Sequence, residues 1–146
     1  MKKAIIVDID GTLADVEHRV HHVRQEPKNW RAFNQAMELD ILNPWCRDLI
    51  LAMKNQSTDV LLVTGRDEDY RSKTEQWLKK NDVPYDHLWM RQASDYRGDD
   101  VVKNEIYNVE IKPKYQVLFV VDDRQSVVKM WRSIGLVCLQ CDWGDF

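Results

Sequence analysis

The chain has 146 residues, of which 44% are hydrophobic and 31% are charged, and its formal net charge is −3. This length suits one domain with a single core, so we expect one domain over residues 1–146. The charge excludes an overall positive field that would attract polyanions, although a local basic patch stays open. No hydrophobic run approaches the ~20 residues of a membrane span, and no secretory signal precedes the first expected strand. We therefore expect a cytoplasmic protein with no membrane contact.

The first hydrophobic run leads directly into Asp8-Ile9-Asp10-Gly11-Thr12. Alternation along a strand would send the carboxylates of Asp8 and Asp10 to the same side. Two like charges so close together are unfavourable unless a cation or a shared proton relieves them. Gly11 lets the backbone turn away sharply and approach a ligand, and we expect Gly11 and Thr12 to contact the substrate. This motif predicts a metal-dependent site.

Residues 14–42 follow the first strand but contain no second strand pattern. A polar stretch precedes a short helix with Trp30, Phe33 and Met37 on one face. We expect Trp30 to pack in the core, although an indole there would also serve to stack on a nucleobase. An insertion beyond the C-terminal end of a strand lies over the edge where open sheets bind ligands. We therefore interpret residues 14–42 as a small cap.

Cationic and imidazole side chains cluster in this cap, at His18, Arg19, His21, His22 and Arg24. One interpretation is a cationic rim for a phosphodiester backbone or a base, in which Arg19 and His22 contact the substrate. The other is an ordinary solvated loop. A zinc site made from the three histidines is a weaker alternative, because no cysteine or carboxylate scaffold accompanies them.

Strands and amphipathic helices then alternate to the end of the chain. Including the first, we expect strands buried on both faces at residues 4–7, 60–63, 87–90, 117–121 and 136–139. The expected helices carry these hydrophobic stripes: Trp45, Leu49 and Met53 behind Asn43-Pro44; Tyr70, Thr74, Trp77 and Leu78; Val102, Ile106 and Val109 behind a cap at Asp99-Asp100; and Val127, Trp131 and Ile134 before Gly135. The alternation predicts an α/β fold with a mainly parallel five-stranded sheet between two helical layers.

The three cysteines are Cys46, Cys138 and Cys141. An odd number without a signal peptide favours reduced thiols. The CxxC spacing of the last two would suit redox or zinc chemistry, but no second cysteine pair lies near it. We favour a structural role, with Cys138 buried in a strand.

In a parallel sheet the C-terminal ends of all strands lie at one edge, and residues with distinctive chemistry follow each strand there. These residues are Asp8 and Asp10, then Thr64, Gly65 and Arg66, then Arg91 and Lys103, and finally Asp122 and Asp123. Carboxylates suit a hard cation, a hydroxyl and backbone N–H groups suit phosphate oxygens, and a lysine neutralises charge. The set predicts phosphoryl transfer.

The ordered motifs DxDGT, TGR, a lysine and DD resemble the haloacid-dehalogenase superfamily of phosphatases. That resemblance implies a three-layer Rossmann-like fold. Residues 97–106, residues 121–132 and the closing Gly144-Asp145-Phe146 resemble, more closely, the 3′-phosphatase domain of phage polynucleotide kinase/phosphatase. The cap matches that domain less well, and the kinase half has no counterpart, because no G-x-x-x-x-G-K-[ST] motif occurs.

The resemblance implies that Asp8 is the nucleophile and forms an aspartyl-phosphate. Asp10 would protonate the leaving oxygen and then activate water. The carboxylate of Asp8, the backbone carbonyl of Asp10 and the pair Asp122 and Asp123 would hold Mg²⁺.

By the same resemblance, Thr64 and Lys103 would bind the transferring phosphoryl group, while Gly65, Arg66 and Arg91 would hold the substrate or the site. The expected reaction removes a 3′-phosphate from DNA or RNA ends. The alternative is a nucleotidase acting on free nucleoside 3′- or 5′-monophosphates. A non-enzymatic receiver domain is a weaker alternative, since receivers lack the DxDGT motif.

Overall fold

The computed structural model describes residues 1–144, so the resemblance at Asp145-Phe146 lies outside the described residues. Its centre is a five-stranded sheet with the order β5-β4-β1-β6-β7, in which every neighbouring pair is parallel. The strands are β1 (Lys2–Val7), β4 (Asp59–Asp67), β5 (His87–Arg91), β6 (Tyr115–Arg124) and β7 (Cys138–Gly144). The predicted α/β fold with a five-stranded sheet is confirmed.

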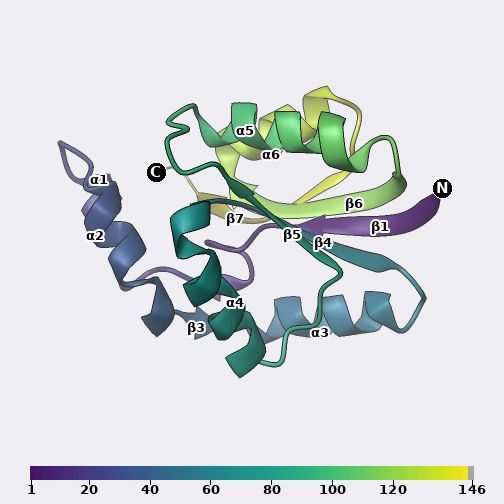
Figure 1. Ribbon diagram of the computed structural model, residues 1–146, viewed down its shortest axis with the longest axis horizontal. Helices are drawn as coiled ribbons and strands as arrows, with labels where there is room; N and C mark the ends of the chain where they lie inside the picture. Colours follow the sequence, from purple (N-terminus) through teal and green to yellow (C-terminus); the bar gives the residue numbers. More distant parts are fainter. Residues whose placement is uncertain (145–146) are drawn as a thin grey trace.

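Helices cover both faces of this sheet, which gives three layers (Figure 1). One layer holds α3 (Pro44–Lys54) and α4 (Arg71–Lys80), and the other holds α5 (Asp99–Ile106) and α6 (Gln125–Ser133). Alternate residues of β1 pack into opposite layers because their side chains point to opposite faces. Ile5 and Val7 join the cluster with α3 and α4, whereas Ala4 and Ile6 join the cluster with α6.

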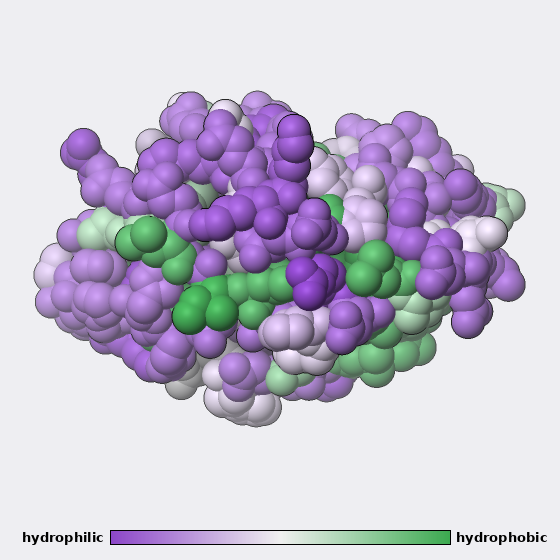
Figure 2. Space-filling model, turned by 90° about the horizontal axis from the view of Figure 1, so that it is seen from below, coloured by the Kyte–Doolittle hydropathy of each residue, from purple (hydrophilic) through white to green (hydrophobic). Residues whose placement is uncertain are grey.

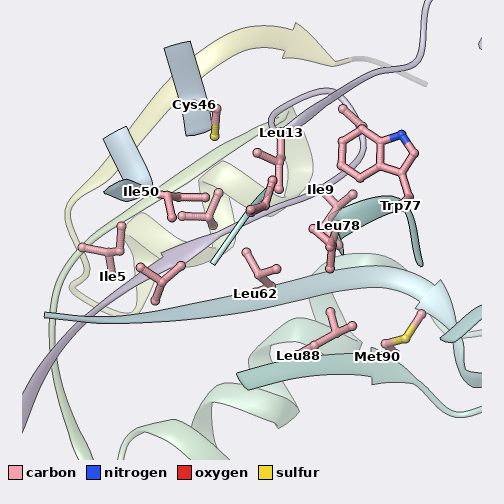
Figure 3. Packing of buried hydrophobic residues seen from close by; sticks show 14 residues of the cluster. Ile5, Ile9, Leu13, Cys46, Ile50, Leu62, Trp77, Leu78, Leu88 and Met90 are labelled. Atoms are coloured by element: carbon pink, nitrogen blue, oxygen red, sulfur yellow. The ribbon is translucent and has the colours of Figure 1, made fainter. Parts of the chain in front are cut away.

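The hydrophobic phase of α3 differs from the expected one. Cys46 and Ile50 are buried and point into the core between α3 and the sheet (Figure 3), whereas Trp45 is 46% exposed. The expected stripe through Trp45 was wrong because the helix carries two adjacent apolar stripes, and only docking on the sheet decides between them. Leu51 is left at the surface. On the face seen from below, Figure 2 shows a hydrophobic strip among polar residues.

The helix after Asp99 also departs from a regular stripe. After Ile106 the chain continues as a π-helical segment, η3 (Tyr107–Ile111). A π-helical turn is wider than an α-helical one, so the residues after it change face. Ile111 is therefore buried and Val109 is 63% exposed, contrary to expectation.

One edge strand of the sheet, β7, is less covered than expected. In β7, Cys138 is buried as predicted, but Leu139 and Trp143 are exposed because β7 pairs on one side only. The expected stop after α6 is confirmed, since Gly135 has a φ of +91°. No helix in the described part of the chain is long and apolar enough to cross a membrane.

Residues 14–42, the segment predicted to be a cap and called the cap below, lie beyond the C-terminal end of β1 (Figure 1). Its elements are β2 (Ala14–Asp15), α1 (His21–Arg24), α2 (Trp30–Gln35), η1 (Met37–Leu39) and β3 (Ile41–Leu42). The expectation of no strand was wrong, because β2 and β3 pair antiparallel and close the insertion at its base. Strands of two residues are too short to show an alternating pattern.

The cap has a small hydrophobic core of its own, made by Val16, Val20, Val23 and Phe33. Phe33 is buried as predicted, but Trp30 is 41% exposed. The expected burial of Trp30 was wrong because it begins α2, where its ring contacts one ring of the cap core, that of Phe33.

Candidate active site

Asp8 lies directly after β1 at the C-terminal edge of the sheet. Its backbone N–H donates to the Val121 carbonyl at 3.0 Å, which fixes its position between β1 and β6. Its buried carboxylate accepts a hydrogen bond from Lys103 Nζ at 2.9 Å, and the Thr12 hydroxyl lies 3.2 Å from its second oxygen. The folded chain thus brings together residues that are 95 positions apart.

Two further carboxylates complete a cluster at this edge. Asp8, Asp122 and Asp123 each present an oxygen within 4.8 Å of the others. Lys103 Nζ also donates to Asp122 at 3.0 Å, and the Trp131 indole N–H donates to the same carboxylate at 3.2 Å. One buried ammonium therefore faces three buried carboxylates.

The pKa values of these groups reflect that imbalance. Burial, together with the charge of Asp122, raises the pKa of Asp8 well above its usual range and that of Asp123 to about 6. Burial alone would lower the pKa of Lys103, but Asp122 and Asp8 raise it above its ordinary value. Clustered anionic oxygens of this kind match the ligands that Mg²⁺ prefers, so the donor set fits that ion.

Gly11 is required by close packing beside this cluster. Its φ is +84°, and a Cβ at this position would collide with the Asp123 carboxylate. The Thr12 hydroxyl is buried between Asp8 and Asp123. The substrate contacts expected for Gly11 and Thr12 stay predictions.

Asp10 has different surroundings from Asp8. Its Oδ1 accepts hydrogen bonds from Arg19 Nη2 at 2.7 Å and from Arg66 Nη2 at 2.6 Å. Burial alone would raise its pKa, but these two guanidinium groups hold it well below the usual range. The carboxylates of Asp8 and Asp10 do not share one cluster, because β1 ends at Val7 and its alternation stops there.

A second carboxylate binds the same two arginines. It belongs to Asp40, which lies in the cap. Its Oδ2 accepts from Arg19 at 2.7 Å and from Arg66 at 3.1 Å, and His18 Nε2 lies 2.7 Å from its Oδ1. Asp40 was missed from the sequence because it belongs to no motif. Nothing in its local sequence distinguishes it from the other acidic residues of the segment, such as Glu38.

Arg19 is fully buried, so the expected exposed rim is wrong for this residue. Its guanidinium donates hydrogen bonds to the carboxylates of Asp10 and Asp40 and to the Phe33 carbonyl. His22 is half-buried beside His21, with ring centroids 4.0 Å apart, and its expected substrate contact stays a prediction.

The TGR motif forms the end of β4. Thr64 is buried, and its hydroxyl oxygen accepts from the Arg66 backbone N–H at 3.1 Å. A Cβ on Gly65 would collide with the Asp99 carboxylate, and Arg91 Nε donates to the Gly65 carbonyl at 2.9 Å. The motif is therefore packed against the start of α5.

Asp99 does not cap α5 with its side chain, contrary to expectation. Gly98 is the N-cap residue, and no side chain accepts a capping hydrogen bond at the N-terminus of α5. Instead, the Asp99 carboxylate pairs with Arg91 and accepts from Arg124 Nη1 at 2.8 Å. It links two arginines at the mouth of the site.

The three-layer fold and the acidic site at its strand ends are those of a phosphatase of the haloacid-dehalogenase superfamily. The class C acid phosphatase from Bacillus anthracis has the same fold, with a TM-score of 0.63 at 16% identity over 84% of this chain and 52% of its own. Within the superfamily, the chain belongs to the family of the polynucleotide kinase PNKP phosphatase domain, which it matches over residues 2–146.

Relatives in this family are longer than the chain. A chain of the Pnkp1/Rnl/Hen1 RNA repair complex is 39% identical, with a TM-score of 0.88, and the match covers 100% of this chain and 44% of that one. A protein of Autographa californica nuclear polyhedrosis virus, named as a bifunctional polynucleotide kinase/RNA ligase, is 28% identical over 140 residues, which are 92% of this chain and 18% of its own length. The chain thus spans less than half of either relative.

Proposed function

We propose that this phosphatase removes 3′-phosphates from DNA or RNA ends in a Mg²⁺-dependent reaction, with residues 1–146 acting as one domain and residues 14–42 as its cap. The observation that carries the proposal is the separation of two neighbouring aspartates into different surroundings. Asp8 contacts Lys103, whereas Asp10 contacts Arg19 and Arg66. Two neighbouring carboxylates held by different cations suit two different tasks in one reaction, one inside the acidic cluster and one beside it. The names of the relatives support nucleic acid ends as the substrate.

In the first step a carboxylate oxygen of Asp8 attacks phosphorus, and the bond from phosphorus to the sugar oxygen breaks. Lys103 and Thr64 would hold the equatorial phosphoryl oxygens, while the pair Asp122 and Asp123 would complete the metal site. Splitting hydrolysis through a covalent aspartyl-phosphate replaces one very slow step with two easier ones.

Asp10 would handle the proton in both steps. A sugar alkoxide is a poor leaving group, so its oxygen needs a proton as the bond breaks. The negative charge of a bound phosphate monoester favours the protonated form of Asp10, against the effect of its two arginines. After the leaving group departs, the carboxylate form held by Arg19 and Arg66 accepts a proton from the water that attacks the intermediate.

The metal would be held by the carboxylates of Asp8, Asp122 and Asp123 together with the backbone carbonyl of Asp10. When bound, Mg²⁺ neutralises charge on the phosphoryl oxygens. Lys103 would neutralise part of the same charge. Its side chain comes from α5, in one of the helical layers, whereas the carboxylates come from the ends of the strands.

The test is a comparison of kcat/KM for Mg²⁺-dependent phosphate release from four substrates, with Asp8→Asn as the blank. The substrates are a 3′-phosphorylated oligonucleotide, its 5′-phosphorylated twin, and the matching free 3′- and 5′-nucleotides. We expect the highest value for the 3′-phosphorylated oligonucleotide. A preference for the free nucleotides would instead identify a nucleotidase and overturn the proposal.

A further inference from the structure

Trp30 is an exposed aromatic side chain at the start of α2 in the cap. It is 41% exposed, although its neighbour in the cap core, Phe33, is buried. Its ring meets the Phe33 ring in a T-shaped contact, with centroids 5.7 Å apart, and two cations, Lys28 and Arg124, each lie 5.8 Å from the centre of the indole ring. An exposed indole between cations is a surface that a planar, anionic ligand fits.

A short series of contacts connects Trp30 to the group that would protonate the leaving oxygen. Asp10 accepts from Arg19, the Arg19 guanidinium lies 4.1 Å from the centre of the Phe33 ring, and Phe33 contacts Trp30. A sugar whose oxygen is protonated by Asp10 must extend away from Asp8, on the Asp10 side of the site. Trp30 lies on that side.

Arg124 approaches Trp30 from the core. It directly follows Asp123 at the end of β6, and Asp99 fixes its guanidinium through a 2.8 Å hydrogen bond. Trp30 and Arg124 therefore belong to different parts of the molecule, residues 14–42 and the sheet, and their side chains meet, with the guanidinium 5.8 Å from the centre of the indole ring. Guanidinium groups both stack on planar rings and bind phosphate.

We propose that Trp30 and Arg124 form a nucleobase clamp across the mouth of the site, in which the base of the phosphorylated nucleotide stacks on the Trp30 indole. Arg124 then meets the next phosphate of the strand or the other face of the base. This inference rests on the proposed function, and it names how that site selects nucleic acid ends. A base presents a π-face whatever its identity, so the clamp is expected to be tolerant of sequence.

Two other exposed tryptophans, Trp45 and Trp143, are weaker candidates for binding a base. Trp45 and Trp143 line a cavity of about 320 Å³ that also touches Gly11 and Asp123. Four acidic side chains and one cation, Arg24, line that cavity among the described residues, so its charge repels a polyanion. Trp45 therefore serves as the matched control.

The experiment uses the full chain with Mg²⁺ and compares substrates that differ only in the terminal base. One pair is a 3′-phosphorylated oligonucleotide with a normal or an abasic 3′-terminal residue, and the other is a nucleoside 3′-phosphate with its base-free sugar phosphate. For Trp30→Ala we expect KM to rise roughly 5- to 140-fold with base-bearing substrates, from a stacking energy of about 1–3 kcal/mol per base. The abasic substrates should be unaffected, and Trp30→Phe should retain most of the wild-type affinity.

A variant of Arg124 distinguishes its two proposed contacts, the next phosphate of the strand and the other face of the base. If Arg124 binds the next phosphate, Arg124→Gln raises KM for the oligonucleotide more than for the mononucleotide. An equal rise on both supports contact with the base itself. No rise on either overturns the part assigned to Arg124.

Three results would overturn the clamp. An equal loss on base-bearing and abasic substrates would show that Trp30 only supports the fold of the cap. An unchanged KM in Trp30→Ala, or a base-dependent loss in Trp45→Ala instead, would move the base elsewhere. These outcomes leave the proposed function intact, whereas a wild-type enzyme that releases phosphate from no nucleic acid substrate refutes both.

Discussion

Replacing Lys103 with methionine tests how the acidic cluster is balanced. The Lys103 side chain is 2% exposed, and its ammonium lies 2.9 Å from Asp8 and 3.0 Å from Asp122. Removing one partner of a buried ion pair leaves an uncompensated charge and costs about 3–5 kcal/mol. At about 2–4 °C per kcal/mol for a protein of this size, the melting temperature should fall roughly 6 to 20 °C in the absence of metal.

The assay is thermal unfolding for the melting temperature and urea unfolding for the free energy, both on metal-free protein, with Lys54→Met as the matched control. Lys54 also contacts an aspartate, Asp86 at 2.9 Å, but both side chains are partly exposed, so this variant should lose only about 0–1 kcal/mol. The loss in Lys103→Met should shrink toward acid pH, where Asp8 and Asp123 become protonated. Equal losses in the two lysine variants, or a loss that grows toward acid pH, would refute this view of the cluster.

Three other predictions follow from the site. In the metal-free protein the pKa of Asp123 is raised to about 6, so the folded state favours the protonated carboxyl. This contribution to stability is present below the ordinary pKa and is lost as the pH rises through about 6. The gain in melting temperature from saturating Mg²⁺ should therefore be larger at pH ~7.5 than at pH ~5, and an equal gain would contradict the shift. Asp10→Asn should lower kcat on nucleotides about 10²- to 10⁴-fold but affect p-nitrophenyl phosphate much less; equal losses would argue against proton delivery by Asp10. Asp40→Asn should lower the free energy of unfolding by about 1–3 kcal/mol, because Arg19 and Arg66 lose a charged acceptor, and an unchanged urea midpoint would contradict this.

Much of the fold could be predicted because its signals are local. Each central strand is a short hydrophobic run, and parallel pairing brings the residues after those runs to one edge. That is why Asp8, Lys103 and Asp122 could be grouped before their distances were known. Helix faces were harder to predict, because two apolar stripes compete in α3 and a π-helical segment shifts the phase after Ile106.

The cap could not be predicted in the same detail because its contacts are tertiary. Arg19 looked like a surface cation, but Asp10 and Asp40 neutralise it in the interior. Trp30 has helical spacing with Phe33 and Met37, yet it lies at the end of the cap helix where the core stops. Neither outcome is encoded in local spacing.

Transfer of phosphate from the nucleic acid to Asp8 tests the central claim most directly. An oligonucleotide with a radiolabelled 3′-phosphate is mixed with the enzyme and Mg²⁺, quenched in acid during turnover, and the protein is digested and mapped. We predict label on the peptide that contains Asp8, and none in Asp8→Asn. Label on a different residue, or phosphate release with no labelled protein at any time, would contradict the account.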